Sequence, residues 1–193
     1  MSSAKPIATT RSVTGIPTGR LAVWWIVASE IVIFGGLLMA YLMLRLKYGE
    51  IWGRDAGMTE MKWGALNTFI LLTSSYFVVL AHQAASKDQR QRAFKFLWLT
   101  IICGFLFMCV KYIEYTSKFS HGIYIDSSVF FSFYFTATGL HGFHVLCGML
   151  IMGIISFDVL KGHELPRVEY IGIYWHFVDL VWIFLFPLLY IAK

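Results

Sequence analysis

The 193-residue chain is 58% hydrophobic and 18% aromatic but only 14% charged, which excludes an ordinary water-soluble domain and indicates an integral membrane protein. Its length accommodates about five or six spans of ~20 residues with their connecting loops, so we expect one membrane domain. The formal net charge of +5 comes from cations scattered over loops and tails, which excludes the clustered basic face of a nucleic-acid-binding protein.

The three cysteines predict no special chemistry. Cys103, Cys109 and Cys147 all lie inside apolar segments, and no CxxC pair occurs. Buried cysteine usually behaves as a small hydrophobic residue. We therefore expect neither a disulfide framework nor a cysteine-based metal site.

The first 20 residues are polar and contain Lys5, Arg11 and Arg20 together with two prolines. They lack the compact apolar region and small-residue cleavage site of a signal peptide. We expect residues 1–20 to be a retained polar tail that ends at the first span.

Five apolar segments follow, and each is long enough to cross a membrane as a helix. We expect an all-α bundle of five transmembrane helices over residues 21–193. The spans are expected at about residues 21–44, 64–84, 94–115, 127–160 and 170–192. A charged loop is expected to follow the first span, from Arg45 to Lys62.

Two further features concern the ends of these spans. Lys111 and Glu114, near the end of the third apolar segment, are expected to reach a membrane interface. Pro187 lacks a backbone N–H and predicts a bend near the end of the last helix.

The distribution of cations predicts the orientation of the bundle. Five spans place the two termini on opposite sides of the membrane. The cations expected on the N-terminal side are Lys5, Arg11, Arg20, Lys87, Arg90, Arg92, Lys95, Lys161 and Arg167. Those expected on the other side are Arg45, Lys47, Arg54, Lys62, Lys111, Lys118 and Lys193. Nine cations against seven predict the N-terminus inside and the C-terminus outside.

The fourth segment carries His141 and His144 among several glycines. Residues three apart occupy neighbouring positions on a helical face, so we expect the two imidazoles to point the same way. Glycine permits close packing, and intramembrane polar groups face protein or water. The segment is therefore expected to be an inner helix of the bundle.

Three more polar residues fall inside apolar segments. At 1.5 Å per residue, Glu30 and Asp179 both lie roughly 13 to 15 Å from the N-terminal surface, and His176 is shallower. His144 is expected near mid-membrane and His141 one turn further out. An ionised carboxyl group at such depth costs several kcal/mol, so we expect Glu30 and Asp179 to be protonated, paired or linked to water.

Four interpretations of these residues are open. Haem ligation needs facing histidines at one depth, and His144 and His176 differ by roughly 10 Å. A carboxylate-bridged di-metal site needs repeated Glu-x-x-His pairs, which the sequence lacks. Proton conduction or transport would use Glu30, Asp179 and His144. The fourth interpretation is structural: the polar groups bind one another and hold helices together.

Four segments together resemble, in order, the signatures of subunit III of haem-copper oxidases. They are WWIVASEIVIFGGLLMAY (24–41), NTFILLTSS (67–75), TGLHGFHVLCG (138–148) and YWHFVDLVWIFLFPLLY (174–190). The resemblance covers nearly all of the chain from Leu21 onward and is best to the cytochrome c oxidase subunit III family in its five-span bacterial form.

This resemblance implies a multi-pass subunit of the bacterial inner membrane, beside catalytic subunit I and with subunit II. The enzyme would reduce oxygen to water in aerobic electron transport, coupled to proton translocation. This chain itself would hold no haem, copper or catalytic residue. It would border a proton-uptake path, bind phospholipid and protect the catalytic subunit from inactivation during turnover, and it would meet cytochrome c or quinol only indirectly.

The resemblance also assigns positions. Glu30 matches the intramembrane glutamate of the family, and His141, His144, His176 and Asp179 match its signature polar positions. We hypothesise that Glu30 stays protonated or shares a hydrogen bond with His144, whereas His141 is structural.

The chain departs from the seven-span form because it lacks the first two spans. The lipid cleft that those spans form would then need equivalent helices from another subunit. Five-span relatives also occur in quinol oxidases and in an accessory protein of nitric oxide reductase, although the Ser29–Glu30 pair favours the cytochrome c enzymes. An autonomous small transporter and a metal-binding membrane protein are the rival classes.

Overall fold

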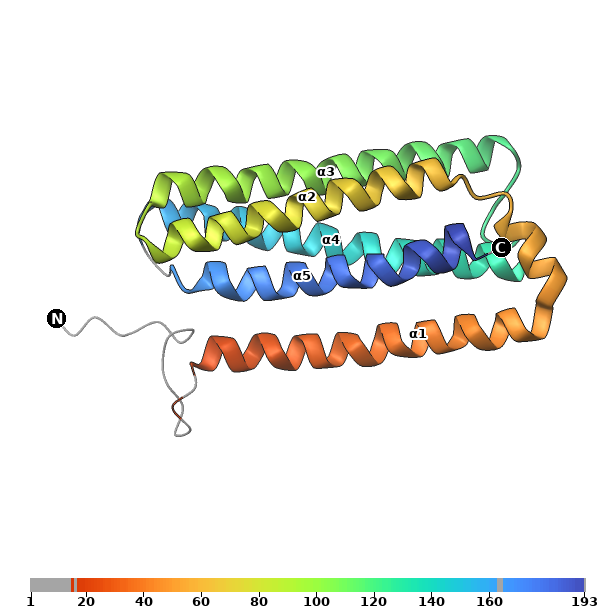
Figure 1. Ribbon diagram of the computed structural model, residues 1–193, viewed down its shortest axis with the longest axis horizontal. Coiled ribbons are helices and arrows are strands. Elements are labelled where there is room, and N and C mark those ends of the chain that lie inside the picture. The colour runs from red at the N-terminus through yellow and green to blue at the C-terminus, as the bar shows by residue number, and fades with distance from the viewer. Residues whose placement is uncertain (1–14, 16, 163–164, 193) are drawn as a thin grey trace.

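The computed structural model describes residues 15, 17–162 and 165–192, and within them the regular structure is helical throughout (Figure 1). The helices are α1 (Thr18–Ala56), α2 (Met61–Ser86), α3 (Arg90–Ser120), α4 (Val129–Leu160) and α5 (Arg167–Phe186), with a closing π-helical turn, η2 (Pro187–Ile191). Five helices are long and apolar enough to cross a membrane. The expected all-α, five-helix fold is confirmed. Lys5, Arg11 and Lys193 lie outside the described residues.

Helix α1 continues well beyond Leu44, through part of the segment expected to be a loop. It bends at Gly49, whose φ of 36° and ψ of −107° lie in a region that side chains with a Cβ rarely adopt. The bend returns Trp52 to the protein interior, where its ring packs edge-on against Tyr41 and Phe130 at 5.3 and 5.2 Å. The helix therefore ends only at Ala56, because Trp52 anchors its last turns.

Helices α2 and α3 pack side by side as an antiparallel pair (Figure 1). Their buried positions alternate at spacings of three and four, the pattern that lets side chains of one helix fit between those of another. In α2 this stripe is Gly64, Asn67, Leu71, Ser74, Val78, Ala81 and Ala85. In α3 it is Ala93, Leu97, Thr100, Gly104, Phe107, Lys111, Glu114 and Lys118. Three charged residues thus continue an otherwise uncharged core stripe.

Helix α4 is the inner helix of the bundle, as the sequence predicts, and packs against α1, α3 and α5. Helix α1 lies at the edge and packs mainly on α4 and α5 (Figure 1). Much of its apolar surface is exposed, including Trp25, Val32 and Met43. This surface is available to lipid or to another subunit.

The last helix changes geometry at Pro187, where the sequence predicts a bend. Helix α5 gives way to η2, in which the Ala192 N–H donates to the Pro187 carbonyl at 2.8 Å. Two side chains satisfy carbonyl groups of this turn: the Tyr41 hydroxyl donates to Leu188 and the Thr59 hydroxyl to Leu189. Irregular helical backbone at membrane depth is tolerated where neighbouring groups satisfy it in this way.

Gly148 is a position where α4 and α5 approach closely. A Cβ atom built there would lie 2.9 Å from the ring of Trp175, whose indole N–H donates to the Ser74 hydroxyl at 2.9 Å. We predict that Gly148→Leu displaces this indole and destabilises the bundle by about 1–3 kcal/mol or more, the usual cost of overpacking. Denaturation in mild detergent measures it. Gly139→Leu is the matched control, since its Cβ meets no atom within 4 Å, and equal losses for both would contradict this packing.

Candidate functional site

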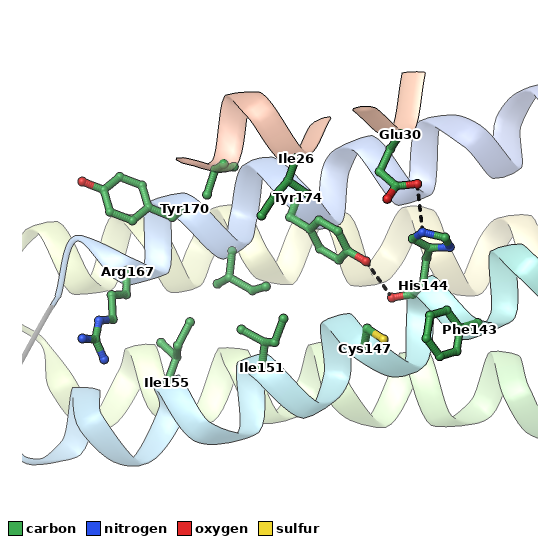
Figure 2. Close-up of a pocket in the computed structure, with 12 residues that line it drawn as sticks. Ile26, Glu30, Phe143, His144, Cys147, Ile151, Ile155, Arg167, Tyr170 and Tyr174 are labelled. Carbon is green, nitrogen blue, oxygen red and sulfur yellow. Dashed lines mark hydrogen bonds and ion pairs between the residues drawn. The ribbon is translucent and has the colours of Figure 1, made fainter. Parts of the chain in front are cut away.

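The structure brings together two of the residues singled out in the sequence. Nε2 of His144 on α4 lies 2.9 Å from Oε2 of Glu30 on α1 (Figure 2). Both side chains are largely buried, with exposed fractions of 10% for His144 and 15% for Glu30. The predicted contact between Glu30 and His144 is confirmed. It is possible because α1 and α4 run in opposite directions and carry these residues at the same depth.

The other ring nitrogen of His144 has a defined partner. Nδ1 of His144 lies 2.8 Å from the Leu140 carbonyl oxygen, which can only accept, so Nδ1 carries a proton. Nε2 and the Glu30 carboxyl group are then close enough to share one further proton. Either the carboxyl group is protonated and donates to the imidazole, or the imidazolium ion pairs with a carboxylate. Both arrangements have zero net charge, which is what a membrane interior favours.

Neighbouring groups hold the His144 ring and its backbone in place. Phe34 on α1 packs edge-on against the ring at 5.2 Å between centroids. The Tyr174 hydroxyl on α5 donates to the His144 backbone carbonyl at 3.2 Å (Figure 2). The Glu30–His144 pair is therefore the point where α1, α4 and α5 meet.

The pair lies at one end of a slot between these three helices, a cavity of about 430 Å³. Its walls are mostly apolar, with Ile26 from α1 and Ile151 and Ile155 from α4 (Figure 2). Ile171 from α5 also lines it. At the other end is Arg167, whose guanidinium donates to Asp158 at 3.2 Å. The slot has the size and polarity to hold an apolar chain with its polar end towards Arg167.

His141 and His144 do not share a site, so the expectation that both imidazoles point the same way is wrong. His141 is fully buried and packs against Phe107 on α3 and Trp182 on α5 at 5.5 and 5.2 Å. Neither of its ring nitrogens has a hydrogen-bond partner among the described residues. Three steps along an α-helix turn a side chain by about 300°, so the two rings leave the helix about 60° apart around its axis. This difference is enough to give them different neighbours.

His176 and Asp179 lie on another side of α5. Nδ1 of His176 is 2.5 Å from the Ser75 hydroxyl of α2. Asp179 is 4% exposed and faces the same Ser75 side chain. The structure therefore joins Glu30 with His144, places His176 and Asp179 together at Ser75, and leaves His141 apart from both pairs.

A second polar cluster, missed in the sequence, lies in the core. Lys111 Nζ is 2.9 Å from Glu114 Oε2 and donates to the hydroxyls of Tyr134 and Tyr190, both at 3.0 Å. The two tyrosines donate to Glu114 Oε1 at 2.7 and 2.9 Å. The ammonium group also lies over four aromatic rings at 4.9 to 5.7 Å. The expectation that Lys111 and Glu114 reach a membrane interface is wrong.

Both charged side chains of this cluster are buried and paired, with exposed fractions of 5% for Lys111 and 2% for Glu114. The positions of Lys111 and Glu114 in the sequence could have indicated that both side chains are buried. Lys111 and Glu114 fall in the same three-and-four register as the buried Gly104 and Phe107. A charged pair on the buried stripe of a helix indicates an internal ion pair rather than the end of a span.

Among the residues that the structure describes, no three histidine, cysteine, aspartate or glutamate side chains lie close enough to hold a metal ion together. The three cysteines are free and half-buried.

Comparison with known proteins gives this arrangement a context. The family model for cytochrome c oxidase subunit III matches residues 8–193. The chain is 37% identical over 168 residues to cytochrome c oxidase subunit 3 of Thermostichus vulcanus, covering 84% of this chain and 82% of that protein. It is 34% identical over 184 residues to the protein of the same name from Marchantia polymorpha, covering 89% and 67%.

A third relative is a longer protein. The heme-copper oxidase subunit I+III of Aeropyrum pernix is 29% identical over 183 residues, covering 90% of this chain and 22% of that protein. Its name describes two subunits in one polypeptide. This chain therefore corresponds to about a fifth of that protein.

Proposed function

Since the chain belongs to the cytochrome c oxidase subunit III family and is a subunit III of a haem-copper oxidase, we propose that it supports oxygen reduction without taking part in the chemistry. The catalytic residues, haem and copper would belong to subunits I and II. Residues 21–193 would act as one membrane domain packed beside subunit I. The relative in which subunits I and III form one polypeptide supports this association.

The observation that carries the proposal is the Glu30–His144 pair at the seam between α1 and the rest of the bundle. It lies within helices long enough to cross the membrane, and its two side chains approach to 2.9 Å. We propose that this pair keeps α1 packed against α4. We also propose that it provides a group that can exchange protons on the side of the oxidase where protons are taken up. His141, His176 and Asp179 would support the helix packing around it.

We further propose that the slot beside this pair holds a phospholipid acyl chain. Its apolar walls and its Arg167 end suit a chain whose headgroup lies towards the start of α5. In this five-helix chain the slot lies between α1, α4 and α5, so it needs no additional helices to form.

The proposed location is a bacterial inner membrane, with the N-terminus inside. The start of α1, the α2–α3 turn and the start of α5 lie at the same end of the bundle (Figure 1). Burial of Lys111 and Lys118 supports the orientation, because it removes two cations from the seven assigned to the opposite side and leaves nine against five. The positive-inside rule then favours the same orientation more strongly.

The test of this function is the behaviour of the oxidase during turnover. We expect a complex prepared without this chain to start at nearly the rate of the intact complex and then to lose activity much faster. Oxygen consumption on reduced cytochrome c and on quinol would show the electron donor, and activity only on quinol would favour the quinol oxidases. Equal lifetimes with and without the chain would contradict the proposal.

The pairing of Glu30 with His144 can be tested by infrared spectroscopy. We expect the bands assigned to Glu30, identified by their loss in Glu30→Gln, to change position in His144→Leu, because the carboxyl group then loses its polar partner on α4. Bands that keep their position in His144→Leu would contradict the pairing.

A further inference from the structure

A second cavity, separate from the slot at Glu30, opens between the last turns of α2 and the first turns of α3. It has a volume of about 530 Å³. From α2 it is lined by Leu80, Gln83 and Ala84, and from α3 by Arg92, Lys95, Phe96 and Leu99. Lys87, directly after α2, and Gln89 line it from the turn. With Lys87 counted after α2, the positions along each helix follow spacings of three, one and three, so one face of each helix lines the cavity.

The cavity changes from charged to apolar with depth. Lys87 and Arg92 flank the turn between the two helices, and Lys95 lies about 4.5 Å further along α3. Leu80 and Leu99 lie about 10 Å from the turn at 1.5 Å per residue. A cationic mouth above an apolar floor matches the two parts of a phospholipid, whose phosphate lies at the membrane surface above its acyl chains.

The positive charge of the mouth is not neutralised locally. No acidic residue among the described ones lines the cavity, and Asp88, in the turn between the two helices, is paired with Arg90 at 2.9 Å. Arg92 donates to the neutral Gln89 at 3.0 Å. In the described part of the chain Lys87 and Lys95 make no ion pair. The three cations are therefore available to an anion.

We propose that this cavity is a binding site for an anionic phospholipid, with the phosphate held by Lys87, Arg92 and Lys95 and an acyl chain against Leu80, Phe96 and Leu99. Basic pockets between transmembrane helices are suited to such headgroups. The apolar floor distinguishes this ligand from a free phosphate ion, which would gain nothing from it. The proposal depends on the membrane location of the chain and not on its role in the oxidase.

The site can be tested with a photoreactive lipid. The complex purified through a tag on this chain would be incubated with phosphatidylglycerol carrying a diazirine in its acyl chain, and the labelled peptides mapped. We expect label on the peptide that contains Phe96 and Leu99. Each Lys or Arg near a membrane surface contributes about a fivefold factor, so the triple variant Lys87→Gln, Arg92→Gln, Lys95→Gln should reduce this labelling on the order of 100-fold.

Controls separate this site from general effects of charge. Lys161→Gln removes a cation at the end of α4, which lies at the same end of the bundle as the α2–α3 turn but outside the cavity. We expect this variant to be labelled to the same extent as the wild type. Lys95→Arg should keep the labelling and Lys95→Gln should reduce it about fivefold. The three cationic side chains are exposed, so these variants should fold.

Four results would overturn the proposal. The first is equal labelling of the wild type and the triple variant. The second is equal labelling by a phosphatidylcholine probe with the same acyl chain, which would show that charge has no role. The third is loss of the label on adding excess inorganic phosphate, which would assign the cavity to a free anion. A cross-link from Lys87 to an acidic partner subunit in place of lipid would also contradict it.

Discussion

Replacing Lys111 by methionine should destabilise the folded chain by about 3–5 kcal/mol, the usual cost of removing one partner of a buried ion pair. The substitution leaves the Glu114 carboxyl in the core with two tyrosine hydroxyls but without the ammonium group that lies 2.9 Å from it. Glu114→Gln should also destabilise, because it leaves the Lys111 ammonium unpaired. Equilibrium denaturation in detergent micelles, followed by the loss of helical signal, measures both.

The double variant Lys111→Met, Glu114→Gln separates pairing from burial. We expect it to cost less than the sum of the two single changes, since neither charge is then left alone in the core. Lys62→Met is the matched control, because Lys62 is exposed near the start of α2 and its loss should stay within about 0.5 kcal/mol. Additive effects of the two core substitutions would contradict the internal ion pair.

The second large effect is expected at the Glu30–His144 pair. Glu30→Leu removes the partner of His144 Nε2 and should loosen α1 from α4, so that less of the chain remains in the purified complex. Glu30→Gln can still donate an amide N–H to the imidazole and should preserve assembly. It cannot exchange a proton, however, so we expect the oxidase to take up protons more slowly and to lose activity several-fold faster during turnover.

The comparison of these two variants distinguishes a structural from a proton-exchanging role. Glu50→Gln provides the control, because Glu50 is an exposed carboxyl group on the same helix. Retention of the chain is read from subunit stoichiometry, and function from proton uptake and active lifetime. If Glu30→Gln matches the wild type in uptake and lifetime while Glu30→Leu loses the chain, the pair is purely structural.

The contact between Glu30 and His144 was predictable because it depends on few quantities. The order of the spans gives the direction of each helix, and the rise per residue gives the depth. Two polar residues at one depth on helices of opposite direction are then candidates for pairing. The all-α five-helix fold follows in the same way from the lengths of the apolar segments.

The surroundings of His141 were not predictable by this argument. Depth and helical face place a side chain relative to its own helix only. Which neighbour occupies a given sector depends on how the other helices pack, and for His141 these are Phe107 and Trp182. The approach of Trp175 to Gly148 depends on the same packing.

Lys111 and Glu114 show how counting apolar residues misleads. Charges at the end of an apolar run resemble the edge of the membrane, but α3 continues to Ser120. The spacing of its buried residues carries the correct information, because a stripe that contains charged residues must pair them inside. Similarly, α1 extends past its apolar part because Trp52 is buried after the bend at Gly49.

The most direct test of the central claim is the visible spectrum of the complex isolated in mild detergent through a tag on this chain. A subunit III of a haem-copper oxidase should bring with it haem-containing partners in stoichiometric amounts, and the preparation should consume oxygen when supplied with a reduced donor. A chain that purifies alone, shows no haem spectrum and moves a solute across liposomes by itself would contradict the account.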